Sequence, residues 1–237
     1  MTAPQPLLLV GSGGLAREVA QAVRGWPDAP WELFGFLDDD PARWGGVVAG
    51  LPVLGPPETA VERSAAAVVV CTGRPGDYAS RARLVARLGL DADRYATVVH
   101  PTAWLSPDTQ VGAGTVLLAG VVATASVRIG AHVAVMPGCV VTHDDVVDDY
   151  ATLASRVVLG GSVHIGRGAY LGAGSMVREG LDVGEWSLTG MGSLVLRDVP
   201  AQEMWFGSPA THRGAAPDPV LAHARQEQPI HSEPGST

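Results

Sequence analysis

Residues 105–200 divide into sixteen blocks of six, which read LSPDTQ, VGAGTV, LLAGVV, ATASVR, IGAHVA, VMPGCV, VTHDDV, VDDYAT, LASRVV, LGGSVH, IGRGAY, LGAGSM, VREGLD, VGEWSL, TGMGSL and VLRDVP. Fourteen of the sixteen blocks begin with Leu, Ile or Val, and the register does not slip. The fifth residue of most blocks is small or β-branched, and Gly is the second residue of seven. A period of six fits neither an α-helix nor a simple β-strand. It is typical of a parallel β-helix built from hexapeptides.

Such a repeat predicts a triangular prism in which three blocks make one coil. The aliphatic first residues then stack along the axis, because no block can bury its own apolar side alone. The glycines are suited to the tight turns between blocks.

Composition limits the classes of function that the chain can have. A length of 237 residues allows one large or two modest domains, and 46% apolar residues support a real core. A formal charge of −8 argues against a nucleic-acid partner. Cys71 and Cys139 lack the spacing of metal ligands and are expected to be reduced core thiols. With no signal segment and no apolar stretch of membrane-spanning length, we expect a soluble, cytoplasmic protein without a membrane partner.

The segment before the repeat has the pattern of a small α/β domain. An apolar run at 7–10 precedes Gly11-Ser12-Gly13-Gly14-Leu15-Ala16, and an amphipathic stretch over 15–25 follows. A strand, a Gly-rich turn and a helix start can bind phosphate through free backbone N–H groups. The alternative is a glycine turn that only packs the helix on the strand.

Further strands are predicted over 31–37 and 65–71, a helix over 77–88 and a last strand over 96–99. Asp38 and Asp39 follow the second strand, where an acid can accept a ribose hydroxyl, although a solvated turn has the same pattern. Gly73 lies at the carboxyl end of the next buried strand. We therefore predict a Rossmann-like domain over 1–100 with about four strands, a prism over 101–213 and a flexible tail over 214–237.

The prism carries one histidine among acids. The block at 141–146 reads Val-Thr-His-Asp-Asp-Val, with His143 at an outward position. Imidazole suits general-base catalysis near neutral pH, and a carboxylate can fix its tautomer. Asp144 is the first candidate partner, provided that the backbone turns there, and Asp145 the second. A metal held by His143 and two acids is a poorly specified alternative, and His132 and His164 are expected to be surface residues.

The chain resembles, over about residues 7–213, the bacterial sugar acyltransferases that join a small α/β domain to a left-handed β-helix of hexapeptide repeats. These include sialic acid O-acetyltransferases and N-acetyltransferases of nucleotide-linked amino sugars. The similar motifs are Gly11-Ser12-Gly13-Gly14, Phe36-Leu37-Asp38-Asp39, Thr72-Gly73, His100-Pro101-Thr102-Ala103, Thr142-His143-Asp144, Leu159-Gly160-Gly161, Gly172-Ala173-Gly174 and Gly207-Ser208-Pro209-Ala210.

This resemblance implies the left hand of the helix, His143 as general base with Asp144 as its partner, and a homotrimer with acetyl-CoA between neighbouring prisms. No metal is implied. The residues implied to contact the CoA are Thr152, Gly161, Ala173 and Met191. Those implied to hold a sugar or nucleotide-sugar acceptor are Gly11, Ser12, Gly13, Gly14, Asp38, Asp39 and Gly73.

Two positions depart from the family's pattern. Leu15 replaces a His that often continues the glycine turn, which removes a polar contact to a nucleotide. Thr152 replaces a His that is frequent in the N-acetyltransferases, which favours an unusual acceptor or O-acylation.

The sequence therefore predicts direct, acyl-CoA-dependent transfer to an amine or hydroxyl of a sugar. A catalytically silent, nucleotide-binding trimeric scaffold is the alternative from another class. A nicotinamide-linked oxidoreductase fits less well, because the α/β segment is too short for two mononucleotide-binding halves.

Overall fold

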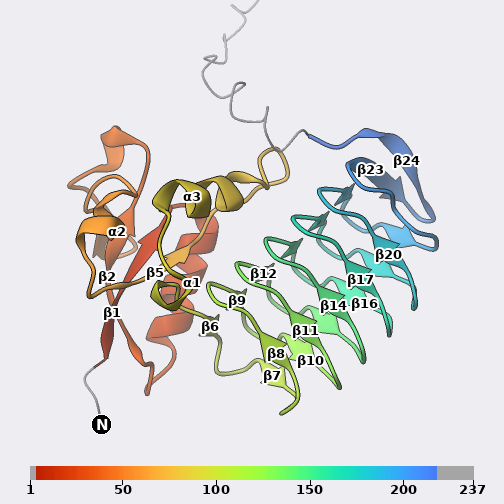
Figure 1. The fold of residues 1–237 in the computed structure, drawn as a ribbon, viewed down its shortest axis with the longest axis horizontal. Helices are drawn as coiled ribbons and strands as arrows, with labels where there is room; N and C mark the ends of the chain where they lie inside the picture. Colours follow the sequence, from red (N-terminus) through yellow and green to blue (C-terminus); the bar gives the residue numbers. More distant parts are fainter. Residues whose placement is uncertain (1–3, 218–237) are drawn as a thin grey trace, which may run out of the picture.

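The computed structural model describes residues 4–217, which form an α/β domain followed by a left-handed parallel β-helix. Figure 1 shows the α/β domain beside the first coils of the prism, and the remaining coils extend away from it. Both predicted architectures are confirmed.

The α/β domain is built on a three-stranded parallel sheet. Its strands are β1 (Gln5–Val10), β2 (Trp31–Leu37) and β5 (Ala67–Val70), in the order β2-β1-β5. The apolar run of β1 is fully buried, as a central strand requires. Helix α1 (Gly14–Arg24) packs its alanine and valine face on the sheet, and α3 (Ser80–Leu88) packs through Leu84 and Leu88. Shorter elements are η1 (Pro41–Arg43), β3 (Val47–Val48), β4 (Leu51–Pro52), α2 (Thr59–Glu62) and η2 (Ala92–Arg94).

The prism consists of two-residue strands that pair in parallel with the strand eighteen residues away. One of its three sheets has the order β22-β19-β16-β13-β10-β7, another β20-β17-β14-β11-β8, and the third contains β21-β18-β15-β12-β9-β6. The strands are β7 (Trp104–Leu105), β8 (Gln110–Val111), β9 (Val116–Leu117), β10 (Val122–Ala123), β11 (Arg128–Ile129), β12 (Ala134–Val135), β13 (Val140–Val141), β14 (Val146–Val147), β15 (Thr152–Leu153), β16 (Val158–Leu159), β17 (His164–Ile165), β18 (Tyr170–Leu171), β19 (Met176–Val177), β20 (Asp182–Val183), β21 (Leu188–Thr189) and β22 (Leu194–Val195).

The predicted register is confirmed along the prism. From Leu117 to Val195, the first residue of every block is buried in one continuous core, apart from Thr189, which is buried but polar. The fifth residues Val121, Val127 and Val133 belong to the same core. The turns between strands need a left-handed residue, and glycine is frequent there because it adopts positive φ at little cost.

Two boundaries differ from the prediction. Strand β6 (Val98–Val99) pairs with β9 of the prism, and the segment before it joins the α/β sheet only through a bridge between Tyr95 and Val68. That sheet therefore has three strands within residues 4–217 and not about four. Val99 lies one block before Leu105, so it continues the repeat. At the other end, β23 (Glu203–Gly207) and β24 (Ala210–Ala215) form a hairpin over the last coil, which includes the first residues of the predicted tail. The tail beyond 217 lies outside the described residues.

The two domains pack tightly against each other. Tyr78 donates a hydrogen bond to the carbonyl oxygen of Trp186 at 2.8 Å. His132 lies between the rings of Tyr95 and Tyr150, with ring centroids 4.6 and 5.2 Å away. The expectation that His132 is a surface residue is therefore wrong, because the α/β domain covers it. Burial, aided by the charge of Arg81, lowers the pKa of His132 to about 4.

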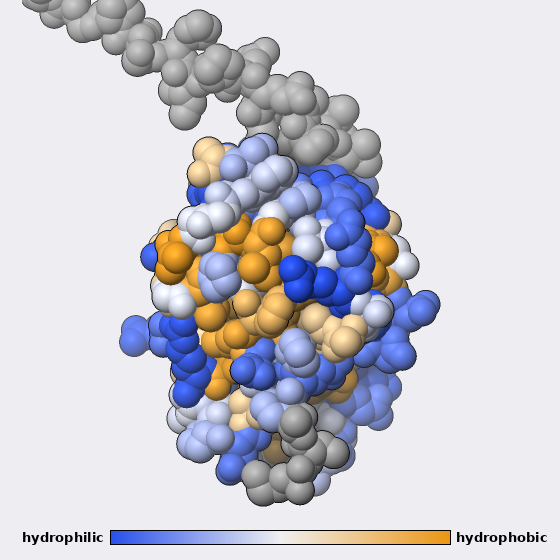
Figure 2. Space-filling view, turned by 90° about the vertical axis from the view of Figure 1, so that its left-hand side faces the viewer, coloured by the Kyte–Doolittle hydropathy of each residue, from blue (hydrophilic) through white to orange (hydrophobic). Residues whose placement is uncertain are grey.

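Within residues 4–217, none of the helices is long and apolar enough to cross a membrane. Figure 2 looks onto the α/β domain and shows apolar side chains among polar ones. Large apolar side chains that this domain exposes include Phe34, Trp44, Val47 and Val61. Cys71 and Cys139 are free and buried, as expected.

The stacked core gives a stability prediction. Leu153 is 0% exposed and stacks between Val135 and Leu171, so Leu153→Ala should lower the free energy of unfolding by about 2–5 kcal/mol. Met176→Ala removes a side chain that is 46% exposed and should change it by only about 0.5 kcal/mol. Chemical denaturation of both variants measures the difference. Similar losses in the two variants would contradict the stacked core.

Candidate active site

The turns of the prism form three edges, each stacked by backbone hydrogen bonds between coils. We call the first the histidine edge: it contains Ala125, His143, Gly161 and Gly180, joined through amides and carbonyls such as Ser162 N to His143 O at 2.8 Å. The second, the docking edge, contains His132, Tyr150, Gly168 and Trp186. The third edge contains Ala119, Pro137, Ser155, Ala173 and Gly192.

His143 and Asp144 form a hydrogen-bonded pair on the histidine edge. Their separation is 2.9 Å between His143 Nδ1 and Asp144 Oδ2, and the two side chains are 64% and 61% exposed. Asp144 has a φ of 62°, so the backbone does turn there, which lets two neighbouring side chains meet. Because a carboxylate only accepts hydrogen bonds, the proton of neutral His143 lies on Nδ1. Nε2 is then the basic nitrogen.

Gly161 lies directly beneath the imidazole of His143. A Cβ atom at Gly161 would overlap Cε1 and Nε2 of the ring, so a side chain there would displace the histidine. The histidine edge therefore places Nε2 beside a bare backbone segment at Gly160–Gly161.

Asp145 points into the prism and has a structural role. Its Oδ2 accepts from Thr142 N at 2.7 Å, and its Oδ1 accepts from Val163 N at 2.8 Å. Burial raises the pKa of Asp145 to about 6, although these two amide bonds act in the opposite direction. Asp145 stands at the fifth position of its block, where most blocks have a small or β-branched residue. Its two carboxylate oxygens already accept hydrogen bonds from backbone amides. The second-choice role for Asp145 beside His143 is therefore wrong. No group of three or more His, Cys, Asp or Glu in residues 4–217 is arranged to hold a metal.

A cavity of about 620 Å³ lies at the carboxyl edge of the α/β sheet. Its lining includes all seven residues implied for the acceptor: Gly11, Ser12, Gly13, Gly14, Asp38, Asp39 and Gly73. Leu15 also lines it. The volume falls in the range of small-ligand sites.

Asp38 holds the glycine turn in place. Its Oδ2 accepts hydrogen bonds from the amide and the hydroxyl of Ser12, the amide at 2.9 Å, and Oδ1 accepts from Asp40 N at 3.0 Å. Helix α1 begins beside it without a side-chain cap or an acid in its first turn. Gly13 and Gly14 at this helix start line the cavity, where the helix itself contributes no carboxylate to compete with an anionic ligand.

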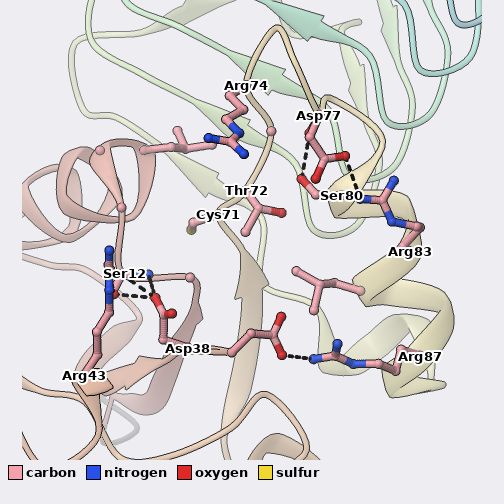
Figure 3. A pocket seen from close by; sticks show the side chains of 17 residues that line it. Ser12, Asp38, Arg43, Cys71, Thr72, Arg74, Asp77, Ser80, Arg83 and Arg87 are labelled. Atoms are coloured by element: carbon pink, nitrogen blue, oxygen red, sulfur yellow. Dashed lines mark hydrogen bonds and ion pairs between the residues drawn. The ribbon is translucent and has the colours of Figure 1, made fainter. Parts of the chain in front are cut away.

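Arginines surround the same cavity. Figure 3 shows Arg43 approaching from one side and Arg83 and Arg87 from the opposite side. Arg43 donates to Ser12 Oγ at 2.8 Å, Arg83 pairs with Asp77 at 2.6 Å and Arg87 pairs with Asp39 at 2.6 Å. Arg74 lines the cavity as well. Four arginines line the cavity together with Asp38, Asp39 and Asp77. Two acids outside the lining, Glu58 and Asp40, also pair with Arg87 at 2.9 Å and with Arg43 at 3.4 Å, so nearby carboxylates balance the arginine charge.

Sequence reasoning missed these arginines, because they come from a turn, a loop and one helix without a common motif. The glycine turn identified the cavity, but the spacing of Arg43, Arg74, Arg83 and Arg87 gives no signal until the chain is folded.

The residues implied to contact CoA do not form one surface in a single chain. Gly161 lies on the histidine edge, and Ala173 lies on the third edge beside Met191, which is 80% exposed. Thr152 is buried, and its Oγ1 accepts a hydrogen bond from Arg81 at 2.8 Å. Gly161 and Ala173 thus lie on different edges of one chain, and Thr152 lies under the α/β domain.

Comparison with solved structures identifies similar folds. A histidine-to-alanine variant of GDP-perosamine N-acetyltransferase from Caulobacter crescentus, in complex with CoA and GDP-perosamine, has 28% identity and a TM-score of 0.78 over 88% of this chain and 97% of that one. The PerB structure from the same organism, with the same two ligands, has 29% identity and a TM-score of 0.77 over the same shares. The resemblance to hexapeptide-repeat sugar acyltransferases is confirmed. The acetyltransferase domain of PglB from Neisseria gonorrhoeae shares the fold, with 24% identity and a TM-score of 0.77 over 89% of this chain and all of that one.

Sequence relatives cover a smaller part of this hexapeptide-repeat chain. An acyl-[acyl-carrier-protein]–UDP-N-acetylglucosamine O-acyltransferase from Pseudomonas paraeruginosa is 31% identical over 108 residues, which is 46% of this chain. The match spans 42% of the length of that relative. No protein-family model matches the chain.

Asp145 gives a prediction on pH. Its pKa of about 6 in the folded protein exceeds the ordinary value for Asp of about 3.9 expected when unfolded, so the folded state binds the proton more tightly. Its contribution to stability should therefore fall as pH rises through roughly 4 to 6, and level off above. Asp145→Asn removes this titration.

Denaturant titrations of both proteins between pH 4 and 8 test it. The stability of the wild type minus that of Asp145→Asn should decline up to about pH 6 and then stay constant. A difference that is independent of pH, or that grows with pH, would contradict the raised pKa.

Proposed function

We propose that this protein transfers an acyl group, in the first instance acetyl, from coenzyme A to an amine or hydroxyl of a nucleotide-linked sugar. The observation that carries the proposal is the pair on the histidine edge. Asp144 holds Nδ1 of His143 at 2.9 Å, the imidazole is largely exposed, and its Nε2 lies beside Gly161, as suits a general base.

The transfer is direct in this proposal. Nε2 of His143 takes the proton of the acceptor amine or hydroxyl as that group attacks the thioester carbonyl. The C–S bond then breaks, and the imidazolium returns the proton to the departing thiolate. Asp144 stabilises the positive ring between these steps. Backbone N–H groups near Gly160–Gly161 are placed to assist the oxyanion.

The α/β cavity is proposed to hold the nucleotide part of the acceptor. Its volume of about 620 Å³, the start of α1 at Gly13 and Gly14 and the arginines in its lining suit a diphosphate. GDP-perosamine, which the two Caulobacter crescentus structures contain, has this chemistry. Leu15 contributes an apolar wall in place of a polar contact.

The proposed site needs two chains. The α/β domain covers the face formed by β6, β9, β12 and β15 and reaches both flanking edges, at Tyr150 and at Leu118. The histidine edge is the corner opposite that face. His143 of one chain therefore serves the cavity of a neighbour in a proposed homotrimer, with acetyl-CoA between the prisms near Ala173 and Met191.

His143→Ala tests the general base. It should lower kcat by about 10²- to 10⁴-fold and leave acetyl-CoA affinity unchanged, because only proton removal is lost. The matched control is His164→Ala: His164 is also half-exposed on the prism and paired with Asp148 and Asp182, at 3.0 and 3.1 Å, but lies off the histidine edge. This control should keep normal kcat.

The measurement is release of free CoA with GDP-linked and UDP-linked amino and hydroxy sugars, alongside calorimetric binding of acetyl-CoA. Full activity of His143→Ala would exclude its role. A wild-type protein that binds the nucleotide but never cleaves the thioester across this panel would favour the scaffold alternative.

A further inference from the structure

Arg81 is a buried cation between the two domains. It lies in the first turn of α3 and is only 1% exposed. Burial lowers the pKa of its guanidinium to about 10, so it remains charged at neutral pH. A buried charge is costly unless hydrogen bonds replace its hydration, so its partners indicate what it stabilises.

The guanidinium joins both domains through five hydrogen bonds. In the α/β domain, Nη1 donates to the carbonyl oxygen of Thr72 at 2.7 Å. In the prism, Nε donates to the carbonyl oxygen of His132 at 2.6 Å. Nη2 donates to the carbonyl oxygens of Tyr150 and Ala151 at 3.0 and 3.1 Å and to Thr152 Oγ1 at 2.8 Å. One planar group thus fixes the end of β5 against two coils.

The α/β end of this linkage is part of the cavity wall. Thr72 and Gly73 line the cavity, and Gly73 has a φ of 128°. A Cβ atom on Gly73 would lie 3.2 Å from Arg81 Nη1 and 3.9 Å from Thr152 Oγ1. The turn therefore rests directly on the guanidinium and on Thr152.

We propose that Arg81 is a positioning residue: it sets the Thr72–Gly73 wall of the acceptor cavity at a fixed place relative to the prism. The effect of Arg81 on the acceptor KM rests on the proposed function. Its effect on the position of the Thr72–Gly73 wall does not depend on that function. The planar fork is essential, because an ammonium group presents only three donors from one atom and cannot reach acceptors on three segments. Arg81→Lys should therefore keep the charge and lose the positioning.

Arg94→Lys is the matched control. Arg94 lies in the same domain and also bonds backbone carbonyls, those of Ala60, Arg63 and Ala66, at 3.0 to 3.1 Å. It does not line the cavity. The two variants thus make the same chemical change at two carbonyl-binding arginines, of which one supports the cavity wall.

Hydrogen–deuterium exchange and steady-state kinetics decide the proposal. In Arg81→Lys, peptides over 72–77 should exchange at least several-fold faster than in the wild type, and Arg94→Lys should leave them unchanged. With GDP-linked amino sugar as acceptor, Arg81→Lys should raise the acceptor KM by about tenfold or more, leaving the acetyl-CoA KM unchanged. A merely structural role would lower thermal stability in both variants without this KM split.

Normal exchange over 72–77 in folded Arg81→Lys would overturn the positioning role, and so would an unchanged acceptor KM in an active enzyme. Should Arg81→Lys fail to fold, Thr152→Val removes only the hydroxyl contact and should give a smaller change in the same direction, whereas no change would also overturn it. If the wild type transfers no acyl group to any acceptor, the proposed function fails, and exchange over 72–77 alone decides the role of Arg81.

Discussion

The structure depends on the stacking of aliphatic side chains every eighteen residues inside a triangular coil. This contact repeats from Leu117 to Val195 and fixes the direction of every other side chain in the prism. Each coil must turn at three corners, and the corners require a left-handed residue. Asp144 occupies such a position, with a φ of 62°, and its carboxylate meets the neighbouring imidazole for that reason. The proposed catalytic pair is therefore a consequence of the repeat.

The same triangular geometry separates His143 from the acceptor cavity, which are the two parts of the proposed site. A prism has three faces and three edges, and the α/β domain occupies one face with its two edges. The remaining edge carries His143. In the proposed mechanism the base and the cavity of one chain lie apart, so the proposal requires that chains associate. Within one chain, Arg81 links the cavity to the prism, because its guanidinium bonds both the Thr72 carbonyl of the cavity wall and the His132 carbonyl of the prism.

The fold of the prism and the location of the cavity could be predicted from the sequence. In a repeat, the period itself shows which residues point into the core. The blocks gave the inward residue of every strand, and the strand, glycine turn and helix at 7–25 located the cavity. The sequence did not predict contacts between the domains. His132 has an outward position in its block, yet the α/β domain buries it, and Val99 continues the repeat across the predicted boundary. Arg81 follows no motif, since a buried arginine is defined by carbonyls from distant segments.

Complementation between inactive subunits tests the central claim most directly. His143→Ala removes the base, and Gly13→Trp fills the cavity, where a Cβ atom on Gly13 meets no atom within 4 Å. The two variants are co-expressed with different tags, and mixed oligomers are isolated and assayed for thioester-dependent transfer to a nucleotide-linked sugar. We predict that mixed oligomers regain activity well above that of either variant alone, because some pairs of neighbours combine an intact His143 with an intact cavity. Inactive mixed oligomers from two folded, associating variants would contradict a site shared between chains.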